Sequence, residues 1–122
     1  MRRASGLALL CMLPALAFCQ SLANGQRIVE KNCMQCHGID KSSDGPALRG
    51  IVGRAAGKLD GYFYSEALAN ATHIWDLKSL KAWLTKPESM IPGVEMDFHL
   101  ERQQDIDDVI AYLATLKSAE KK

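Results

Sequence analysis

Apolar residues recur at helical spacing in three parts of the chain, which predicts three amphipathic helices. The first is expected over residues 24–35, with Asn24 as its N-cap, and the second lies between Asp76 and Pro87. The third covers residues 103–117. It has the most regular apolar stripe, formed by Ile106, Val109, Ile110, Leu113 and Leu116.

The segments between these helices carry turn-forming residues. Residues 38–58 are rich in Gly, Ser, Asp and Pro, and residues 88–99 also predict an irregular loop. A short helix is expected over 65–70, with Ser65 as its N-cap. No segment alternates convincingly as a strand does, so the sequence predicts an all-α domain. So long a loop needs a surface to pack on, and its apolar residues are expected to point inward: Leu48, Ile51 and Val52.

The first 23 residues differ from the rest in character. A positively charged start precedes an apolar run from Gly6 to Phe18, and Ser21-Leu22-Ala23 offers small residues at the cleavage positions of a secretory signal peptide. The run is short for a membrane span, and a retained anchor is the alternative. We expect a signal peptide over 1–23, a domain over 24–122, and secretion into the periplasm.

Composition then narrows the class of protein. The formal net charge is only +1, which is too small to suggest nucleic acid or an anionic membrane surface as a partner. Of the four cysteines, Cys11 and Cys19 fall in the expected leader, so Cys33 and Cys36 remain. Aromatic residues make up 7% of the chain, which implies a modest core. A large apolar cofactor would help to fill it.

The two remaining cysteines stand in the motif Cys33-Met34-Gln35-Cys36-His37, or C-x-x-C-H, which is typical of covalent c-type haem attachment. Thiols three positions apart can share one face of a helical turn and form two thioethers with one porphyrin. His37 can then bind the iron. A thioredoxin-like dithiol would need a βαβ setting, and a zinc site would need more ligands nearby. His73 and His99 are expected to face solvent.

The second axial position of such an iron is not decided by spacing. Met34 lies inside the attachment motif and cannot reach the opposite face. The candidates that remain are Met90, Met96, His73 and His99. Met90 and Met96 both flank Ile91-Pro92-Gly93, so their positions in the sequence do not separate them.

Several further motifs, in a fixed order, resemble class I cytochromes c of the mitochondrial and α-proteobacterial type. They are Gly45-Pro46-Ala47-Leu48, Gly50-Ile51-Val52-Gly53-Arg54, Gly61 to Tyr64, Trp75, Leu80, Lys86 to Met96 and Val109 to Leu113. With the C-x-x-C-H motif they cover nearly all of the expected domain. The resemblance implies that the N- and C-terminal helices pack together, with shorter helices and loops around one covalent haem.

The resemblance also implies roles for individual residues. Met96 would be the distal iron ligand, and the carbonyl of Pro46 would accept a hydrogen bond from the proximal imidazole. Arg54, Tyr64 and Trp75 would hydrogen-bond a buried haem propionate, which needs such donors. Trp83 stands where the family usually has a tyrosine near the methionine sulfur.

The function that the resemblance implies is that of a soluble, monomeric, monohaem one-electron carrier in the periplasm, and not an enzyme. Its expected partners are a quinol-oxidising complex, an oxidase or reductase, or a periplasmic dehydrogenase. Two alternatives stay open: a dedicated electron-accepting subunit of one such dehydrogenase, and a ligand-binding or catalytic haem protein with a labile sixth ligand. At positions where mitochondrial members carry docking lysines, this chain has Asn32, Glu88 and Glu95.

Overall fold

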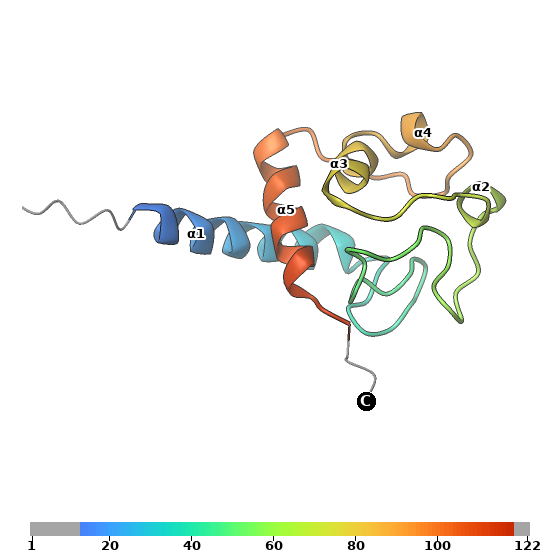
Figure 1. Cartoon of the computed structure of the whole chain (residues 1–122), viewed down its shortest axis with the longest axis horizontal. Helices are drawn as coiled ribbons and strands as arrows, with labels where there is room; N and C mark the ends of the chain where they lie inside the picture. The colour runs from blue at the N-terminus through green and yellow to red at the C-terminus, as the bar shows by residue number, and fades with distance from the viewer. Residues whose placement is uncertain (1–12, 119–122) are drawn as a thin grey trace, which may run out of the picture.

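Two helices from opposite ends of the chain cross each other and form one side of the fold (Figure 1). They are α1, Leu13–Ile28, and α5, Gln103–Thr115, in a computed structural model that describes residues 13–118. Ile106, Val109, Ile110 and Leu113 of the predicted stripe are buried in α5, which confirms the pattern for these residues. Leu116 lies just past the end of the helix and is partly buried. The largest fully buried side chains are Val29, Ile106 and Val109.

The two helices approach closely because Gly25 has no side chain. A Cβ atom at Gly25 would lie 2.6 Å from the backbone carbonyl carbon of Asp108 and 3.0 Å from the Cβ of Tyr112. The carboxylate of Asp108 is itself buried, and it accepts hydrogen bonds from Asn24 Nδ2 at 2.7 Å and from Gln104 Nε2 at 2.8 Å. The crossing is therefore fixed by close backbone packing and by paired polar groups.

The prediction that Asn24 caps the first helix was wrong, because α1 is already helical from Leu13. Leu and Ala, which are good helix formers, dominate the residues that precede Asn24 and let the helix continue through it. The amide of Asn24 instead donates across the crossing, to Asp108 and also to Asp105 at 3.2 Å. The charged start of the expected leader lies outside the described residues.

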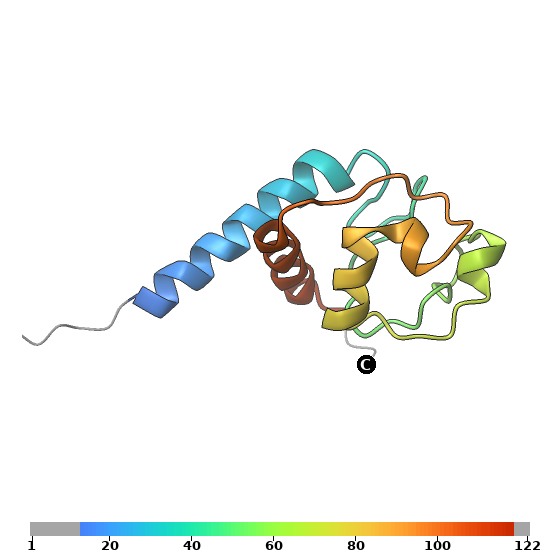
Figure 2. The same ribbon diagram turned by 90° about the horizontal axis from the view of Figure 1, so that it is seen from above.

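The N-terminal part of α1 extends beyond α5 as an exposed rod (Figures 1 and 2). Residues 14–20 are all exposed, including Leu16 and Phe18, whose exposed fractions are 67% and 60%. Within residues 13–118, no helix combines the length and the apolar character needed to cross a membrane.

Three shorter helices follow in the middle of the chain. They are α2, Glu66–Ala69, α3, Leu77–Thr85, and α4, Pro87–Met90. The caps predicted for α2 and α3 are confirmed: Ser65 accepts a hydrogen bond from Leu68 N, and Asp76 accepts one from Ser79 N at 2.8 Å. Ser79 Oγ accepts from Asp76 N in return, which completes a capping box.

Helix α4 corrects the expectation of an irregular loop directly after α3. Pro87 ends α3, as predicted, but it also occupies the first turn of a new helix. Proline is favourable there because its fixed φ suits a helix and the first turn needs no backbone donor. The rest of that segment, from residue 91 to 102, is without helix.

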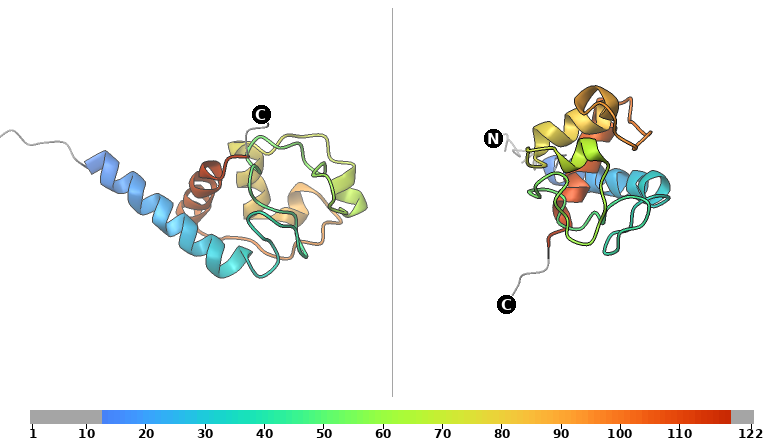
Figure 3. Two further views of the ribbon diagram at one scale, coloured as in Figure 1. Left: turned by 90° about the horizontal axis from the view of Figure 1, so that it is seen from below. Right: turned by 90° about the vertical axis from the view of Figure 1, so that its right-hand side faces the viewer.

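The remaining chain consists of loops, as predicted for residues 38–58. These loops and α2 lie on the side of the fold away from the α1–α5 crossing, with α2 farthest from it (Figures 2 and 3). Leu48 and Ile51 are buried and Val52 is partly buried. Within the described residues, the pairing between extended backbone segments consists of one antiparallel bridge, between Ala55 and Ile74. The all-α prediction is therefore confirmed.

We expect Gly25→Ala to destabilise the protein by about 1–3 kcal/mol, because the added methyl group overpacks the crossing. This loss exceeds the gain of about 0.5–1 kcal/mol that alanine brings to a helix interior. Urea unfolding of the purified protein, followed by circular dichroism, measures the change.

The matched control is Gln26→Ala, which changes an exposed residue of the same helix and should alter the free energy of unfolding by less than about 0.5 kcal/mol. Equal stabilities for Gly25→Ala and the unmodified protein would contradict the close crossing.

Candidate haem attachment site

Helix α1 leads into the C-x-x-C-H motif through a change of helix type. Val29–Cys33 form a π-helical turn, which ends with Met34 N donating to Val29 O at 3.2 Å. Backbone bonds then run from Cys36 N to Cys33 O at 3.1 Å and from His37 N to Cys33 O at 2.8 Å. The motif thus forms a tight turn at the end of the helix. Short π-helical segments are often found at functional sites, and the sequence pattern did not reveal this one.

The two thiols differ in environment. Cys33 is partly buried, whereas Cys36 is exposed. Burial, and secondarily the neighbouring Cys36, raises the pKa of the Cys33 thiol to about 11. A redox-active dithiol instead needs a lowered thiol pKa. No group of three or more His, Cys, Asp or Glu side chains in the described part of the chain could hold a metal ion. Neither observation favours the dithiol or zinc alternatives.

His37 is held by the loop that follows it. Its Nδ1 lies 2.7 Å from the carbonyl oxygen of Pro46. Because a carbonyl can only accept, Nδ1 must carry the proton, and Nε2 is left as the nitrogen able to bind a metal ion. Such a hydrogen bond orients a ligating imidazole and raises its basicity. The structure therefore brings His37 and Pro46 together in the arrangement that the resemblance implies.

Gly45 allows this arrangement because it packs directly against the imidazole. A Cβ at Gly45 would lie 2.6 Å from His37 Nδ1. The Gly45 backbone N–H donates to the Cys36 carbonyl at 2.7 Å, and Leu48 N donates to the Gly38 carbonyl at 2.9 Å. These bonds fasten the loop against the attachment turn.

Arg54 has a buried nitrogen that lacks a partner. One guanidinium nitrogen, Nη2, donates to the Arg49 carbonyl at 2.8 Å, but Nη1 is buried and makes no hydrogen bond. Burial lowers the pKa of Arg54, and Tyr64 nearby partly opposes this effect. A buried guanidinium needs an acceptor, preferably an anion. The propionate of a haem supplies such an anion, so the donor set of this site fits haem.

Two aromatic residues of the expected site, Trp75 and Trp83, lie together. Trp75 and Trp83 are both buried, and their rings meet edge to face with centroids 5.3 Å apart. Tyr64 is partly buried, accepts a hydrogen bond from Leu59 N at 3.3 Å and packs edge-on against Tyr62. The structure does not test hydrogen bonds from these residues to a propionate, which stay predictions.

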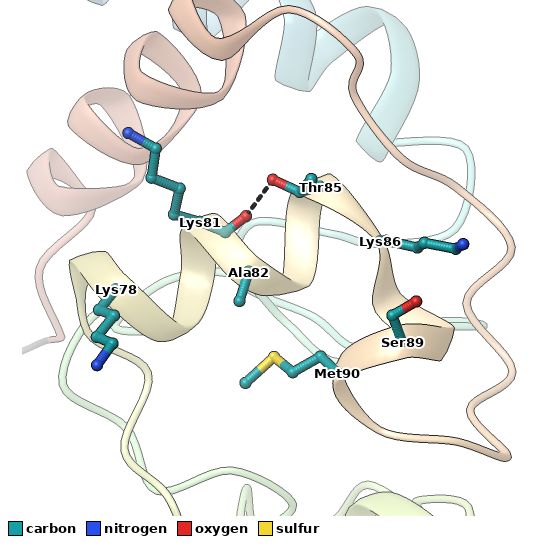
Figure 4. A pocket seen from close by; sticks show the side chains of 7 residues that line it. All are labelled: Lys78, Lys81, Ala82, Thr85, Lys86, Ser89 and Met90. Atoms are coloured by element: carbon teal, nitrogen blue, oxygen red, sulfur yellow. Dashed lines mark hydrogen bonds between the residues drawn. The ribbon is translucent and has the colours of Figure 1, made fainter.

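The two candidate methionines have different surroundings, although both are partly buried against the core. Met90 lines a groove of about 410 Å³ over the exposed face of α3, as Figure 4 shows. The groove is formed with Lys78, Lys81, Ala82, Thr85, Lys86 and Ser89. The opposite, buried face of α3 carries Trp83. Met90 therefore lies on the outer side of α3 and not on the side that carries Trp83. This position favours Met96 as the axial ligand. That assignment stays a prediction.

The histidines differ from one another in a way that sequence reasoning missed. His99 is exposed, as expected. His73 is not fully exposed: its Nε2 is buried and has no hydrogen-bond partner among the described residues. Its ring lies edge-on to that of Trp75, with centroids 4.5 Å apart. The expectation that His73 faces solvent was therefore wrong. The antiparallel bridge between Ala55 and Ile74 places the His73 and Trp75 side chains on the inner side of the fold.

Comparison with known proteins agrees with this geometry. Residues 22–117 match the cytochrome c family. Cytochrome c of Euglena viridis is 41% identical over 96 residues, which cover 76% of this chain and 94% of that protein. A cytochrome c homolog of Rickettsia typhi is 41% identical over 95 residues, which cover 75% of this chain and 54% of that protein.

A solved structure shows the same fold. Cytochrome cH from Methylobacterium extorquens superposes with a TM-score of 0.73 at 40% sequence identity, covering 77% of this chain and 97% of that one. The fold is that of the class I cytochromes c, as the sequence motifs implied. The chain therefore belongs to the cytochrome c family, whose members bind covalent haem c with its iron and transfer electrons instead of catalysing substrate chemistry.

Proposed function

We propose that this chain is a soluble, exported monohaem cytochrome c that carries single electrons between protein partners in the periplasm. The observation that supports it best is the hydrogen bond of His37 Nδ1 to the Pro46 carbonyl, at 2.7 Å, directly after the Cys33–Cys36 turn. This bond leaves the other imidazole nitrogen for iron. One ring nitrogen that donates to a carbonyl and a second whose lone pair is free for a metal ion are the pattern of a proximal haem ligand.

Each residue of the site has one part in this proposal. Cys33 and Cys36 would hold the haem through thioethers, and His37 and Met96 would bind its iron. When bound, haem supplies an iron that alternates between Fe(III) and Fe(II). With both axial positions filled by the protein, little room remains for substrate chemistry.

The protein surrounds this centre with groups already held in place. Gly45 and Pro46 fix the orientation of the His37 ring. Arg54 offers the unpaired Nη1 to a propionate, while Trp75 and Trp83 exclude water. Groups that need not move when charge changes keep reorganisation small, since fixed donors replace mobile solvent. The site is suited to fast outer-sphere electron transfer.

The partners in this proposal are a quinol-oxidising complex or a periplasmic dehydrogenase as donor, and an oxidase or reductase as acceptor. Electron-transfer encounters of this kind use small interfaces. A stable complex with one dehydrogenase would instead indicate a dedicated subunit. As a free carrier, the protein would act as a monomer.

We expect the haem-loaded protein to give a low-spin c-type spectrum with a weak methionine-to-iron charge-transfer band and no response to carbon monoxide. Met96→Leu should abolish that band and allow carbon monoxide to bind the ferrous protein, because the sixth position is then open. Met90→Leu is the matched control and should leave both properties unchanged. Optical spectra of the oxidised and reduced proteins measure them.

Loss of the band in Met90→Leu, with none in Met96→Leu, would reverse the ligand assignment. Ready carbon monoxide binding by the unmodified protein would favour a ligand-binding or catalytic haem protein.

The exposed part of α1 supports the proposal of a signal peptide over residues 1–23. Leu16 and Phe18 present apolar surface on a helix that extends away from the domain. Such a surface is unusual in a finished soluble protein. Burial begins near Ser21 and increases at Gly25, close to the proposed cleavage after Ala23.

We expect the mature protein, isolated from the periplasmic fraction, to have the mass of haem plus residues 24–122. Ala23→Leu should slow processing, because cleavage requires a small residue there. Mass spectrometry of both proteins checks this. An uncleaved chain in the membrane fraction would indicate a retained anchor.

Electron transfer should depend weakly on ionic strength. Glu88 and Glu95, where mitochondrial members have lysines, are both exposed, so a strongly acidic partner surface would be repelled from this part of the molecule. Stopped-flow rates with the native partner, measured over increasing salt, test this. A steep fall in rate with added salt would contradict it.

A further inference from the structure

The buried nitrogen of His73 has no role in the function proposed above. Its Nε2 exposes less than 1 Å² to solvent and makes no hydrogen bond. A buried polar atom without a partner costs about 1–3 kcal/mol, so native proteins rarely keep one. Among the described residues, the same condition is recorded for one other side-chain atom, Nη1 of Arg54.

These two atoms come from the two sides of one short antiparallel ribbon. Trp75 N donates to the Arg54 carbonyl at 2.9 Å, and Ala56 N donates to the His73 carbonyl at 2.9 Å. Together they flank the bridge between Ala55 and Ile74. Each of the two nitrogens thus belongs to a residue next to this bridge.

The ribbon places both side chains on its inner face. Side chains alternate along extended backbone, so Arg54, His73 and Trp75 leave from one face and Ile74 from the other. Burial agrees with this, since Ile74 is 48% exposed and Trp75 is 6% exposed. The inner face is the one that carries the proposed propionate donors.

Arg54 and His73 are close enough to share an acceptor. Across the ribbon, Arg54 lies opposite Trp75, and Ala56 lies opposite His73. Arg54 and His73 are therefore a diagonal pair, and the Cβ atoms of such a pair lie within about 7–8 Å of each other. A guanidinium and an imidazole can both reach a group placed between them.

We infer that His73 is a further positioning residue of the haem site, donating its Nε2–H to the buried propionate that Arg54 also binds. This inference rests on the proposed haem function. A carboxylate offers about four acceptor positions, and a buried one requires several donors. The two donors that the protein leaves unpaired meet that requirement from one face of one ribbon.

The donor should affect the iron electrostatically. A hydrogen bond spreads the negative charge of the carboxylate, which otherwise stabilises the extra positive charge of Fe(III). Removing the donor should therefore lower the reduction potential. Replacing it with another donor should not.

The test is a redox titration of the haem-loaded protein and three variants. His73→Leu fills the space without a donor, and its potential should fall below that of the unmodified protein. His73→Gln keeps an N–H donor and should restore most of the difference. His99→Leu removes an exposed histidine and should leave the potential unchanged.

A second measurement asks whether the acceptor is shared. His73→Leu and Arg54→Gln are combined, and their effects on the potential are compared with the sum of the single effects. Two donors on one carboxylate should give non-additive effects, because each compensates in part for loss of the other.

Three results would overturn the inference. They are an unchanged potential in His73→Leu, an equal fall in His73→Gln and His73→Leu, and strict additivity with Arg54→Gln. The last two would assign His73 to packing, or to a separate bound water. Failure of the haem proposal itself would appear independently, as an unmodified protein without a c-type spectrum.

Discussion

The position of the haem attachment turn depends on the close crossing of α1 and α5. Gly25 lets the two backbones meet, and the apolar side chains of Val29 and Ile106 fill the contact that follows. Because Cys33 lies only two turns beyond Gly25 on the same helical path, the crossing also determines where the turn enters the domain. The rest of the chain has little regular structure that could hold the turn in place if the crossing moved.

Buried polar groups divide into those that the protein satisfies itself and those that have no partner among the described residues. At the crossing, Asn24 and Gln104 satisfy the buried carboxylate of Asp108. At the attachment turn, Pro46 satisfies one nitrogen of His37. Within residues 13–118, the two buried side-chain nitrogens without a partner, Arg54 Nη1 and His73 Nε2, both belong to residues beside the bridge between Ala55 and Ile74. A protein that folds around an anionic, mostly apolar group has a physical reason to keep such donors in that place.

The loops on the far side of the fold are held by single hydrogen bonds between a side chain and the backbone. Tyr62 donates its hydroxyl proton to the Asp44 carbonyl at 2.6 Å, and Lys58 donates to the Ala69 carbonyl at 2.6 Å. Glu88 accepts from the backbone of Gly93 at 3.1 Å, which fastens the segment leading to Met96. Ties of this kind restrain loops but bury little apolar surface. Apolar contact on this side comes from buried residues such as Leu48, Ile51 and Trp75, to which the large apolar cofactor of this family would add.

The sequence by itself determined the local features of this protein. Helical periodicity predicted α5, and residue type predicted the caps Ser65 and Asp76. The motif from Cys33 to His37 indicated the class of cofactor. Each of these features depends on residues that lie close together in the chain. The tertiary structure alone decided the rest. Asn24 finds its partner in Asp108, and Gly25 is needed where it meets the backbone of Asp108, and both contacts join residues far apart in the sequence. Likewise, His73 looks like a surface residue until the bridge between Ala55 and Ile74 turns it inward beside Trp75. Burial and pairing are properties of neighbours brought together by folding, and spacing along the chain does not contain them.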